Sequence, residues 1–215
     1  MNSQEEKPFV SRGGLKLQHA LDAFAFDVNG RVCADFGCSV GGFTDCLLRN
    51  GALHVYSIDT AYGVFDYRLR MDDRVTVIER TNVLHCECPV ENGVDLVVID
   101  AGWTTQERVI PQALKWTYGE GAIITLIKPH YEFDKMPTDE RSRIGLDEGK
   151  NSRGILHEAD AEAVCAWVIE GLKSLFDVEV AGVTQSPIRG GGKRGKRKSV
   201  GNVEYLALLR RSPSE

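Results

Sequence analysis

Several features are scarce in this chain of 215 residues, and each scarcity narrows the class of protein. No run of 18 uncharged apolar residues occurs, so we expect no membrane-spanning helix. The first residues are polar and include Glu5, Glu6 and Lys7, which is unlike a secretory signal peptide. The six cysteines are scattered, which indicates reduced thiols in a cytoplasmic protein.

The sequence also gives no sign of a metal site or of a second domain. Cys86 and Cys88 have His85 beside them, but a zinc site would need a second such pair, so we interpret this stretch as a loop. The length fits one domain with a full core, and no internal repeat or domain boundary stands out. We therefore expect a flexible N-terminus at 1–8 and one domain at 9–211.

Positive charge is concentrated near the end of the chain, although the net charge is −5. Residues 186–215 contain eight Lys and Arg against two acids, while the remainder contains 18 against 29. Residues 189–198 form a glycine-rich basic loop with six cations, no acid and no aromatic residue. Such a segment suits a phosphate backbone better than base stacking. A disordered basic tail is the alternative, but an apolar strand follows it.

The most informative stretch is a strand, a glycine turn and a helix in succession. The apolar run Val32–Phe36 predicts a buried strand, Gly37, Gly41 and Gly42 follow within six residues, and an apolar helical pattern begins at Phe43. This is the first unit of a doubly wound α/β fold. Glycine permits close backbone approach to a ligand, and the helix N-terminus adds free N–H groups.

The glycine spacing argues against a dinucleotide site, in which the second glycine comes two places after the first. Here it comes four places later, and Asp35 precedes the first glycine. The pattern Asp-x-Gly-x-Ser-x-Gly-Gly resembles motif I of S-adenosylmethionine methyltransferases. The next predicted strand, 54–58, ends in Asp59, which could accept both ribose hydroxyls of a nucleoside. The alternative is a tight turn with a solvated aspartate.

Two more polar residues follow predicted strands near this site. Tyr62 could lie against a bound adenosine or pack in its loop, and Asn82 could contact an adenine edge or support a turn after the strand 75–79. The candidate cofactor-binding residues are Asp35, Gly37, Cys38, Ser39, Gly41, Gly42, Phe43, Thr44, Asp59, Tyr62, Asn82 and Asp100.

Two charged residues end the predicted central strands 94–100 and 121–127. Asp100 is the last residue of the first, and Lys128 follows the second, where Pro129 stops the strand. Neighbouring strands lie about 4.8 Å apart, so the two side chains can meet. Ligands of open α/β sheets bind at these carboxyl ends, which favours a functional role for both.

The other elements complete an α/β, Rossmann-like methyltransferase fold: a mostly parallel seven-stranded sheet with an antiparallel edge and helices on both faces. A first helix within 9–26 has Ser11 as a plausible N-cap, and Lys16 by itself fits a solvated helix face. Residues 130–153 are polar and predict a mobile loop or lid. Further helices are expected at 107–116 and 158–176, and an antiparallel strand pair at 178–186 and 203–209.

Five motifs, in order, resemble the TlyA (hemolysin A) branch of the FtsJ-like ribosomal RNA 2′-O-methyltransferases. They are Phe9-Val-Ser-Arg-Gly-Gly-Leu-Lys, the 35–44 loop, Glu79-Arg-Thr-Asn, Leu126-Ile-Lys-Pro and Gly201-Asn-Val-Glu. The resemblance implies S-adenosylmethionine as cofactor, ribosomal RNA or a ribosomal subunit as partner, and methylation of a ribose 2′-hydroxyl. It also implies a catalytic tetrad of Lys16, Asp100, Lys128 and Glu204, with Lys128 as the candidate general base.

The sequence also departs from this family. The family's usual N-terminal RNA-binding domain is not expected ahead of residue 9, and Ala-Gly-Trp-Thr follows Asp100 in place of the common Val-Ser-Phe. We expect RNA contacts from Arg12, Arg189, Lys193, Arg194, Lys196, Arg197 and Lys198. The alternative function is a catalytically silent nucleotide- or RNA-binding module of the same fold. A dehydrogenase is opposed by the glycine spacing, and a membrane-damaging hemolysin by the lack of an amphipathic or spanning segment.

Overall fold

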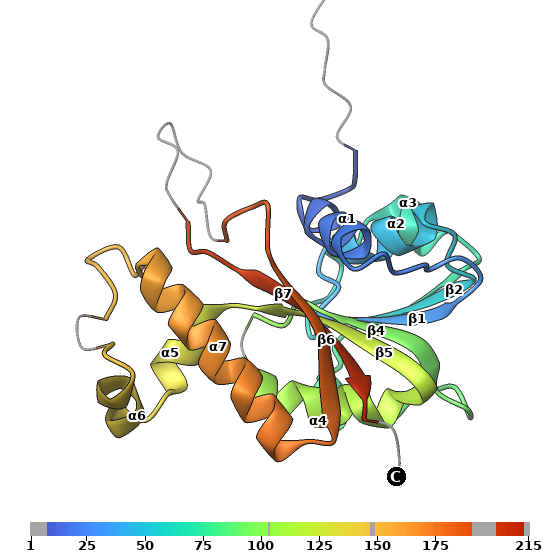
Figure 1. Cartoon of the computed structure of the whole chain (residues 1–215). Helices are drawn as coiled ribbons and strands as arrows, with labels where there is room; N and C mark the ends of the chain where they lie inside the picture. Colours follow the sequence, from blue (N-terminus) through green and yellow to red (C-terminus); the bar gives the residue numbers. More distant parts are fainter. Residues whose placement is uncertain (1–7, 103, 147–148, 191–200, 213–215) are drawn as a thin grey trace, which may run out of the picture.

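The apolar runs of the sequence form the strands of one sheet (Figure 1). The computed structural model describes residues 8–102, 104–146, 149–190 and 201–212. In this part of the chain the sheet has seven strands in the order β3-β2-β1-β4-β5-β7-β6. They are β1 (Val32–Phe36), β2 (His54–Ile58), β3 (Val75–Ile78), β4 (Val94–Ile99), β5 (Thr117–Ile127), β6 (Val178–Gln185) and β7 (Tyr205–Arg211).

The pairing of the strands confirms the predicted α/β fold. β1 to β5 are parallel to one another, whereas β7 is antiparallel to both β5 and β6. Every predicted strand is present, and most bounds agree within a residue or two; β5 begins four residues earlier than expected. Continuous apolar runs locate buried central strands well because both faces of such strands are covered.

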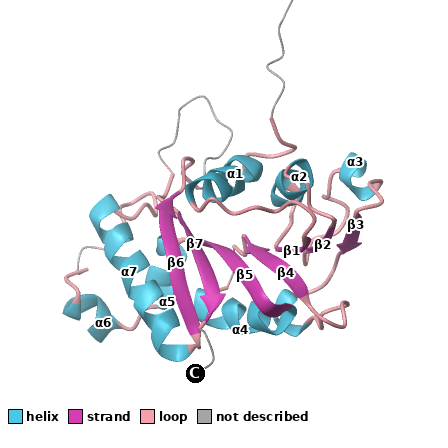
Figure 2. Ribbon diagram, turned by 45° about the vertical axis from the view of Figure 1, so that its right-hand side comes forward, coloured by secondary structure: helices cyan, strands magenta, loops and turns pink. Residues whose placement is uncertain are grey.

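Helices cover both faces of the sheet (Figure 2). They are α1 (Gly13–Ala23), α2 (Gly42–Arg49), α3 (Tyr67–Arg70), α4 (Gln106–Trp116), α5 (Pro129–Lys135), α6 (Thr138–Arg143) and α7 (Glu158–Leu175), with a 3-10 helix at Val83–His85. α1, α2 and α3 lie on one side, and α4, α5 and α7 lie on the other. No helix in the described residues is long and apolar enough to cross a membrane.

Each face of the sheet has its own apolar core. Leu17 and Leu21 of α1 pack with Phe43 and Leu47 of α2 on one face. The side chains of α4 and α7 form the core of the other face, where the Trp116 and Phe36 rings meet edge to face at 5.0 Å. The two cores fix the sheet from both sides, so the ends of its strands form a rigid platform.

Close contact between α1 and α2 depends on a glycine at the start of α2. A Cβ at Gly42 would collide with Ser11 Oγ and would lie 3.1 Å from the Gly14 nitrogen. The absence of a side chain therefore lets the N-terminus of α1 lie directly against that of α2. This contact brings Lys16 of α1 next to the glycine turn.

Two predictions about local structure are wrong. Residues 130–153, expected to be a mobile loop, contain most of α5 and all of α6. Pro129 occupies the first turn of α5 as well as ending a strand. Ser11 is not the N-cap of α1: Arg12 holds that position, and Ser11 Oγ instead accepts the Gly13 N–H.

Candidate active site

A cavity of about 370 Å³ opens at the carboxyl ends of β1, β4 and β5. Its walls include Lys16, Asp100, Lys128 and Glu204, and also Asp35, Gly37 and Phe43 around the glycine turn. Residues that lie far apart in the sequence thus meet where ligands of open α/β sheets bind. The volume falls within the range of small-molecule sites.

Two ion pairs stand in this cavity. Lys128 Nζ lies 2.5 Å from Asp100 Oδ1, which confirms that the tips of β4 and β5 bring these residues together. Lys16 Nζ lies 2.5 Å from Glu204 Oε2, and both of those side chains are almost fully buried. Lys16 is therefore not on a solvated helix face, the interpretation that composition alone favoured.

The backbone around Glu204 holds its side chain in the cavity. Gly190 and Asn202 form a β-bridge through two N–H to carbonyl hydrogen bonds, and Glu204 O accepts the Ser186 N–H at 2.8 Å. The Asn202 side chain ties this segment to 154–156 by accepting the Leu156 N–H. A Cβ at Gly190 would collide with the Glu204 carboxylate, so glycine is required there.

The glycine turn is built for close backbone approach. Gly37 has φ 86°, a left-handed conformation, and a Cβ there would lie 2.8 Å from the Asp100 carbonyl oxygen. The Gly37 and Cys38 N–H groups both donate to Ile58 O, and the Ser39 N–H donates to Asp59 Oδ2 at 2.8 Å. The turn after β1 is therefore fixed to the end of β2.

Asp35 is the buried acid of this turn. Its Oδ2 accepts hydrogen bonds from the Thr44 N–H and the Thr44 hydroxyl, at 3.0 and 2.7 Å. Its Oδ1 has no hydrogen-bond partner among the described residues. Burial raises the pKa of Asp35 to about 7, against the opposing effect of the Thr44 hydrogen bonds. A buried, unpartnered carboxylate oxygen beside the cavity suits a cationic ligand.

The cavity contains only some of the predicted site residues. Besides those above, Cys38, Ser39, Gly42, Arg12 and Arg189 line it. Thr44 lies behind the turn, hydrogen-bonded to Asp35 and Ser57, and Gly41 has φ 100° with Leu69 and Phe65 beside it. Lys193, Arg194, Lys196, Arg197 and Lys198 lie outside the described residues.

Three residues predicted to contact the adenosine part of the cofactor do not line the cavity. Asp59 accepts the Ser39 and Ala61 N–H groups, and Asn82 Oδ1 accepts the Leu84 N–H as the cap of the 3-10 helix. Tyr62 is 66% exposed and stacks under the Arg80 guanidinium at 3.9 Å. Their contacts with a nucleoside remain predictions.

Sequence reasoning missed several residues that line the cavity. Ser11, Gly13, His130, Tyr131 and Gly190 are among its walls. Pro129 could have indicated His130 and Tyr131, since proline favours the first turn of a helix and would place both beside Lys128. Ser11 and Gly190 reach the cavity because segments distant in sequence pack together, and the sequence alone carries no signal for that packing.

The sheet order, the glycine turn and the cavity define a Rossmann-like S-adenosylmethionine-dependent methyltransferase. The same fold occurs in the N-methyltransferase NodS from Bradyrhizobium japonicum in complex with S-adenosyl-L-homocysteine, with a TM-score of 0.57, 14% identity, and coverage of 97% of this chain and 90% of that one. The family model described as FtsJ-like methyltransferase matches residues 9–160, so the chain belongs to that family.

More similar relatives carry related names. The 16S/23S rRNA (cytidine-2′-O)-methyltransferase TlyA of Mycobacterium tuberculosis is 35% identical over 97% of this chain and 70% of its own length. Hemolysin A of Brachyspira hyodysenteriae is 32% identical over 93% of this chain and 75% of its own. A solved structure described as a candidate hemolysin from Streptococcus thermophilus has a TM-score of 0.79 and 30% identity, and covers 98% of this chain and 70% of that one.

Proposed function

We propose that this protein transfers a methyl group from S-adenosylmethionine to a ribose 2′-hydroxyl of ribosomal RNA. The proposal depends on one observation: two ion pairs, Lys128 with Asp100 and Lys16 with Glu204, lie in one cavity beside the glycine turn. The name of the TlyA relative specifies 2′-O-methylation of rRNA, and this supports a ribose hydroxyl of rRNA as the group that accepts the methyl. Such a substrate is consistent with the cytoplasmic location expected from the sequence.

The residues that would hold the methyl donor come from the glycine turn. Gly37, Cys38 and Ser39 present backbone close to the cavity, and Asp35 provides the buried carboxylate for a positive group. When bound, S-adenosylmethionine supplies an electrophilic methyl group on a sulfonium. Asp59, Tyr62 and Asn82 would serve the adenosine end.

Lys128 is the proposed general base. Once Lys128 had released its own proton to solvent, its Nζ lone pair would take the proton of the 2′-hydroxyl. The hydroxyl oxygen would bond to the methyl group that S-adenosylmethionine would supply, and the carbon–sulfur bond would break. The products are a 2′-O-methyl ribose, a protonated lysine and S-adenosylhomocysteine. Asp100 orients Lys128 through the 2.5 Å contact, and the Lys16–Glu204 pair lies beside it, because Tyr205 pairs with Ile127.

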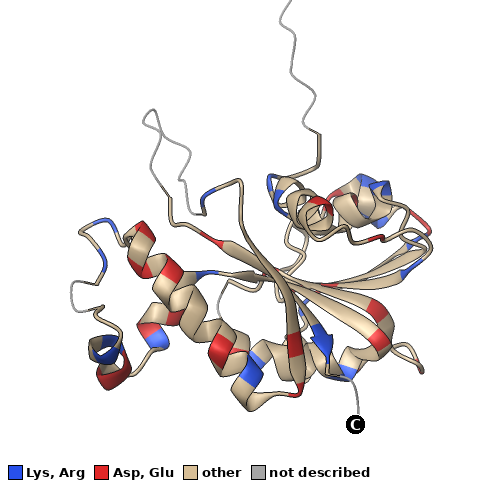
Figure 3. Ribbon diagram, viewed as in Figure 1, with Lys and Arg blue, Asp and Glu red and all other residues tan. Residues whose placement is uncertain are grey.

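The charge pattern favours one approach for RNA. α7 has acidic residues along much of its length and one lysine near its end, as Figure 3 shows in red and blue, so its face would repel phosphates. Arg12 and Arg189 line the cavity at the carboxyl ends of the strands. The proposed route therefore enters over the cavity, with the basic segment 189–198 adding phosphate contacts.

A direct test is methylation with radiolabelled S-adenosylmethionine. Purified ribosomal subunits and naked ribosomal RNA are offered separately, and the labelled RNA is hydrolysed in alkali. Label retained in alkali-resistant dinucleotides would support 2′-O-methylation, because the modified oxygen can no longer attack the neighbouring phosphate. Label on bases, or none in RNA, would contradict the proposal. Binding of S-adenosylhomocysteine without transfer to any RNA would favour the silent binding module.

A further inference from the structure

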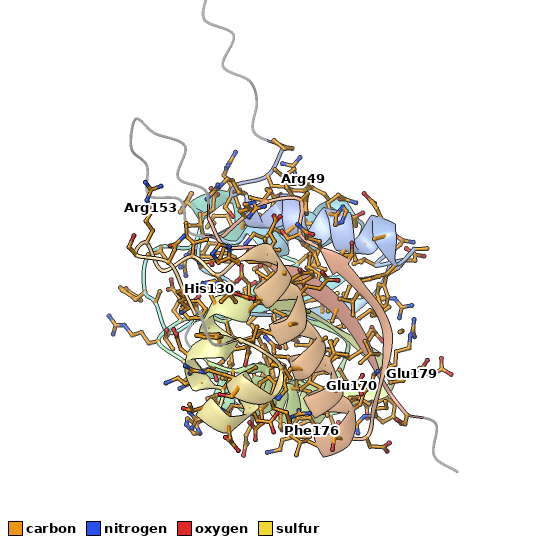
Figure 4. The ribbon with its side chains drawn as sticks, turned by 60° about the vertical axis from the view of Figure 1, so that its left-hand side comes forward. Arg49, His130, Arg153, Glu170, Phe176 and Glu179 are labelled. Carbon is orange, nitrogen blue, oxygen red and sulfur yellow. The ribbon has the colours of Figure 1, made fainter. Side chains whose placement is uncertain are left out.

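One histidine of the cavity has no role in the mechanism above. His130 is the second residue of α5, and Figure 4 labels it near the end of the pale yellow helices. It lines the same cavity as Lys128 and Asp100. The neighbouring Tyr131 also lines the cavity, and the two ring centroids are 4.4 Å apart with an angle of 35° between the planes.

The strand order places His130 on the acceptor side of the site. The glycine turn follows β1, Asp100 follows β4, and His130 follows β5, so β4 separates His130 from the proposed cofactor loop. The next strand beyond β5 is β7, and Arg189, from the connection between β6 and β7, also lines the cavity. A nucleotide whose ribose faces Lys128 would have this end of the cavity for its remaining groups.

The His130 side chain has an unused hydrogen-bonding atom. Nδ1 is buried and has no partner among the described residues, whereas Lys128 and Lys16 each have a carboxylate partner. A buried nitrogen without a partner destabilises the fold, because it has given up its hydrogen bonds to water. Nδ1 is closed off from the cavity, whereas Nε2 is not among the buried atoms without a partner, so Nε2 is the ring atom that a bound substrate can reach.

The charge state of His130 indicates what kind of group this is. Burial and the nearby Lys150, Lys128 and Lys16 lower the pKa of His130 to about 4, so the ring is neutral at pH 7. A neutral imidazole has one donor and one acceptor, a poor match for a phosphate but a good match for the edge of a nucleobase. The partly exposed Tyr131 ring beside it offers a flat surface for a base.

We propose that His130 determines which nucleotide is methylated, by hydrogen bonding through its Nε2 atom to the base of the acceptor nucleotide. This inference rests on the proposed 2′-O-methyltransferase function. It assigns His130 to substrate selection and leaves the methyl transfer itself to Lys128 and its neighbours.

The test uses RNAs that differ only in the base of the methylated nucleotide, once that position has been mapped. For each of the four bases, kcat/KM is measured with the wild type and with His130→Phe, His130→Asn and His130→Gln. Asparagine places a polar atom near Nδ1, and glutamine places one near Nε2. His157→Phe is the matched control, because His157 is exposed and lies outside the cavity lining. Binding of S-adenosylhomocysteine and the melting temperature are measured for every variant.

We expect the wild type to prefer one base, and His130→Phe to reduce that preference about tenfold with unchanged S-adenosylhomocysteine binding. His130→Gln should retain more of the preference than His130→Asn, and this comparison still decides the matter if the phenylalanine variant unfolds. Equal kcat/KM for all bases with the wild type, or an unchanged preference in His130→Phe, would overturn the inference and leave the proposed function intact. No RNA methylation by the wild type would overturn both.

Discussion

Lys16 Nζ and Glu204 Oε2 lie 2.5 Å apart although 188 residues separate the two in the sequence. Both residues are almost entirely buried, at 9% and 3% exposure. The pair joins α1, at the start of the described chain, to the segment that leads into β7. It lies beside the end of β5 that carries Lys128, because Tyr205, the residue after Glu204, pairs with Ile127.

This relationship predicts a stability cost when one partner is removed. Glu204→Gln leaves a buried ammonium without its counter-charge, so the free energy of unfolding should fall by about 3 kcal/mol in urea titrations. The exposed pair Lys173 and Glu170 on α7 is the control, and Glu170→Gln should change it by no more than about 0.5 kcal/mol. Equal losses of unfolding free energy in the two variants would show that the Lys16–Glu204 pair stabilises the fold no more than an exposed pair does.

Gly42 should tolerate no side chain. In Gly42→Ala the new Cβ meets Ser11 Oγ and the Gly14 nitrogen, which forces α1 away from α2 and shifts Lys16. We expect a loss of about 1–3 kcal/mol in stability together with reduced methylation. Gly171→Ala, in α7 where nothing lies within 4 Å, should be neutral or stabilise by up to about 1 kcal/mol. Unfolding curves that do not separate the two variants would refute the packing argument.

The stability that Asp35 and Glu132 contribute should fall as pH rises from about 4 to about 7. Burial raises the pKa of Asp35 from 3.8, and that of Glu132 from 4.5, to about 7 in each case. Between these values the folded chain keeps protons that the unfolded chain has released, so higher pH favours unfolding. Urea titrations at pH 5 and pH 7.5 measure the difference. Asp35→Asn and Glu132→Gln should each reduce this decline, and a decline unaffected by both would contradict the assignment.

The basic segment should control how RNA binding depends on salt. Replacing Lys193, Arg194, Lys196, Arg197 and Lys198 with serine removes five charges, so RNA affinity should fall. The slope of log affinity against log salt should flatten by about 0.7 for each lost contact with single-stranded RNA. Replacing the distant surface residues Lys115 and Lys173 with serine gives the control. A slope unchanged by the first set would reject the phosphate-binding role.

The sequence predicted features that depend on neighbouring residues, and it did not predict features that depend on residues far apart in the chain. The central strands and the meeting of Asp100 with Lys128 followed from local apolar runs and sheet geometry. The burial of Lys16 did not follow, since its partner is distant in sequence and only the family resemblance associated the two. Residues 130–153 were misjudged because a polar segment can still be helical when its few apolar residues, such as Phe133 and Met136, reach the core.

The central claim is that Lys128 takes the proton of a ribose hydroxyl. The measurement that tests it most directly is methylation of the mapped RNA by Lys128→Ala, with S-adenosylhomocysteine binding measured on the same preparation and Lys173→Ala as control. The account predicts that cofactor binding persists while the rate of methylation falls by at least about 100-fold. Methylation at the wild-type rate by Lys128→Ala with the cofactor bound would contradict it.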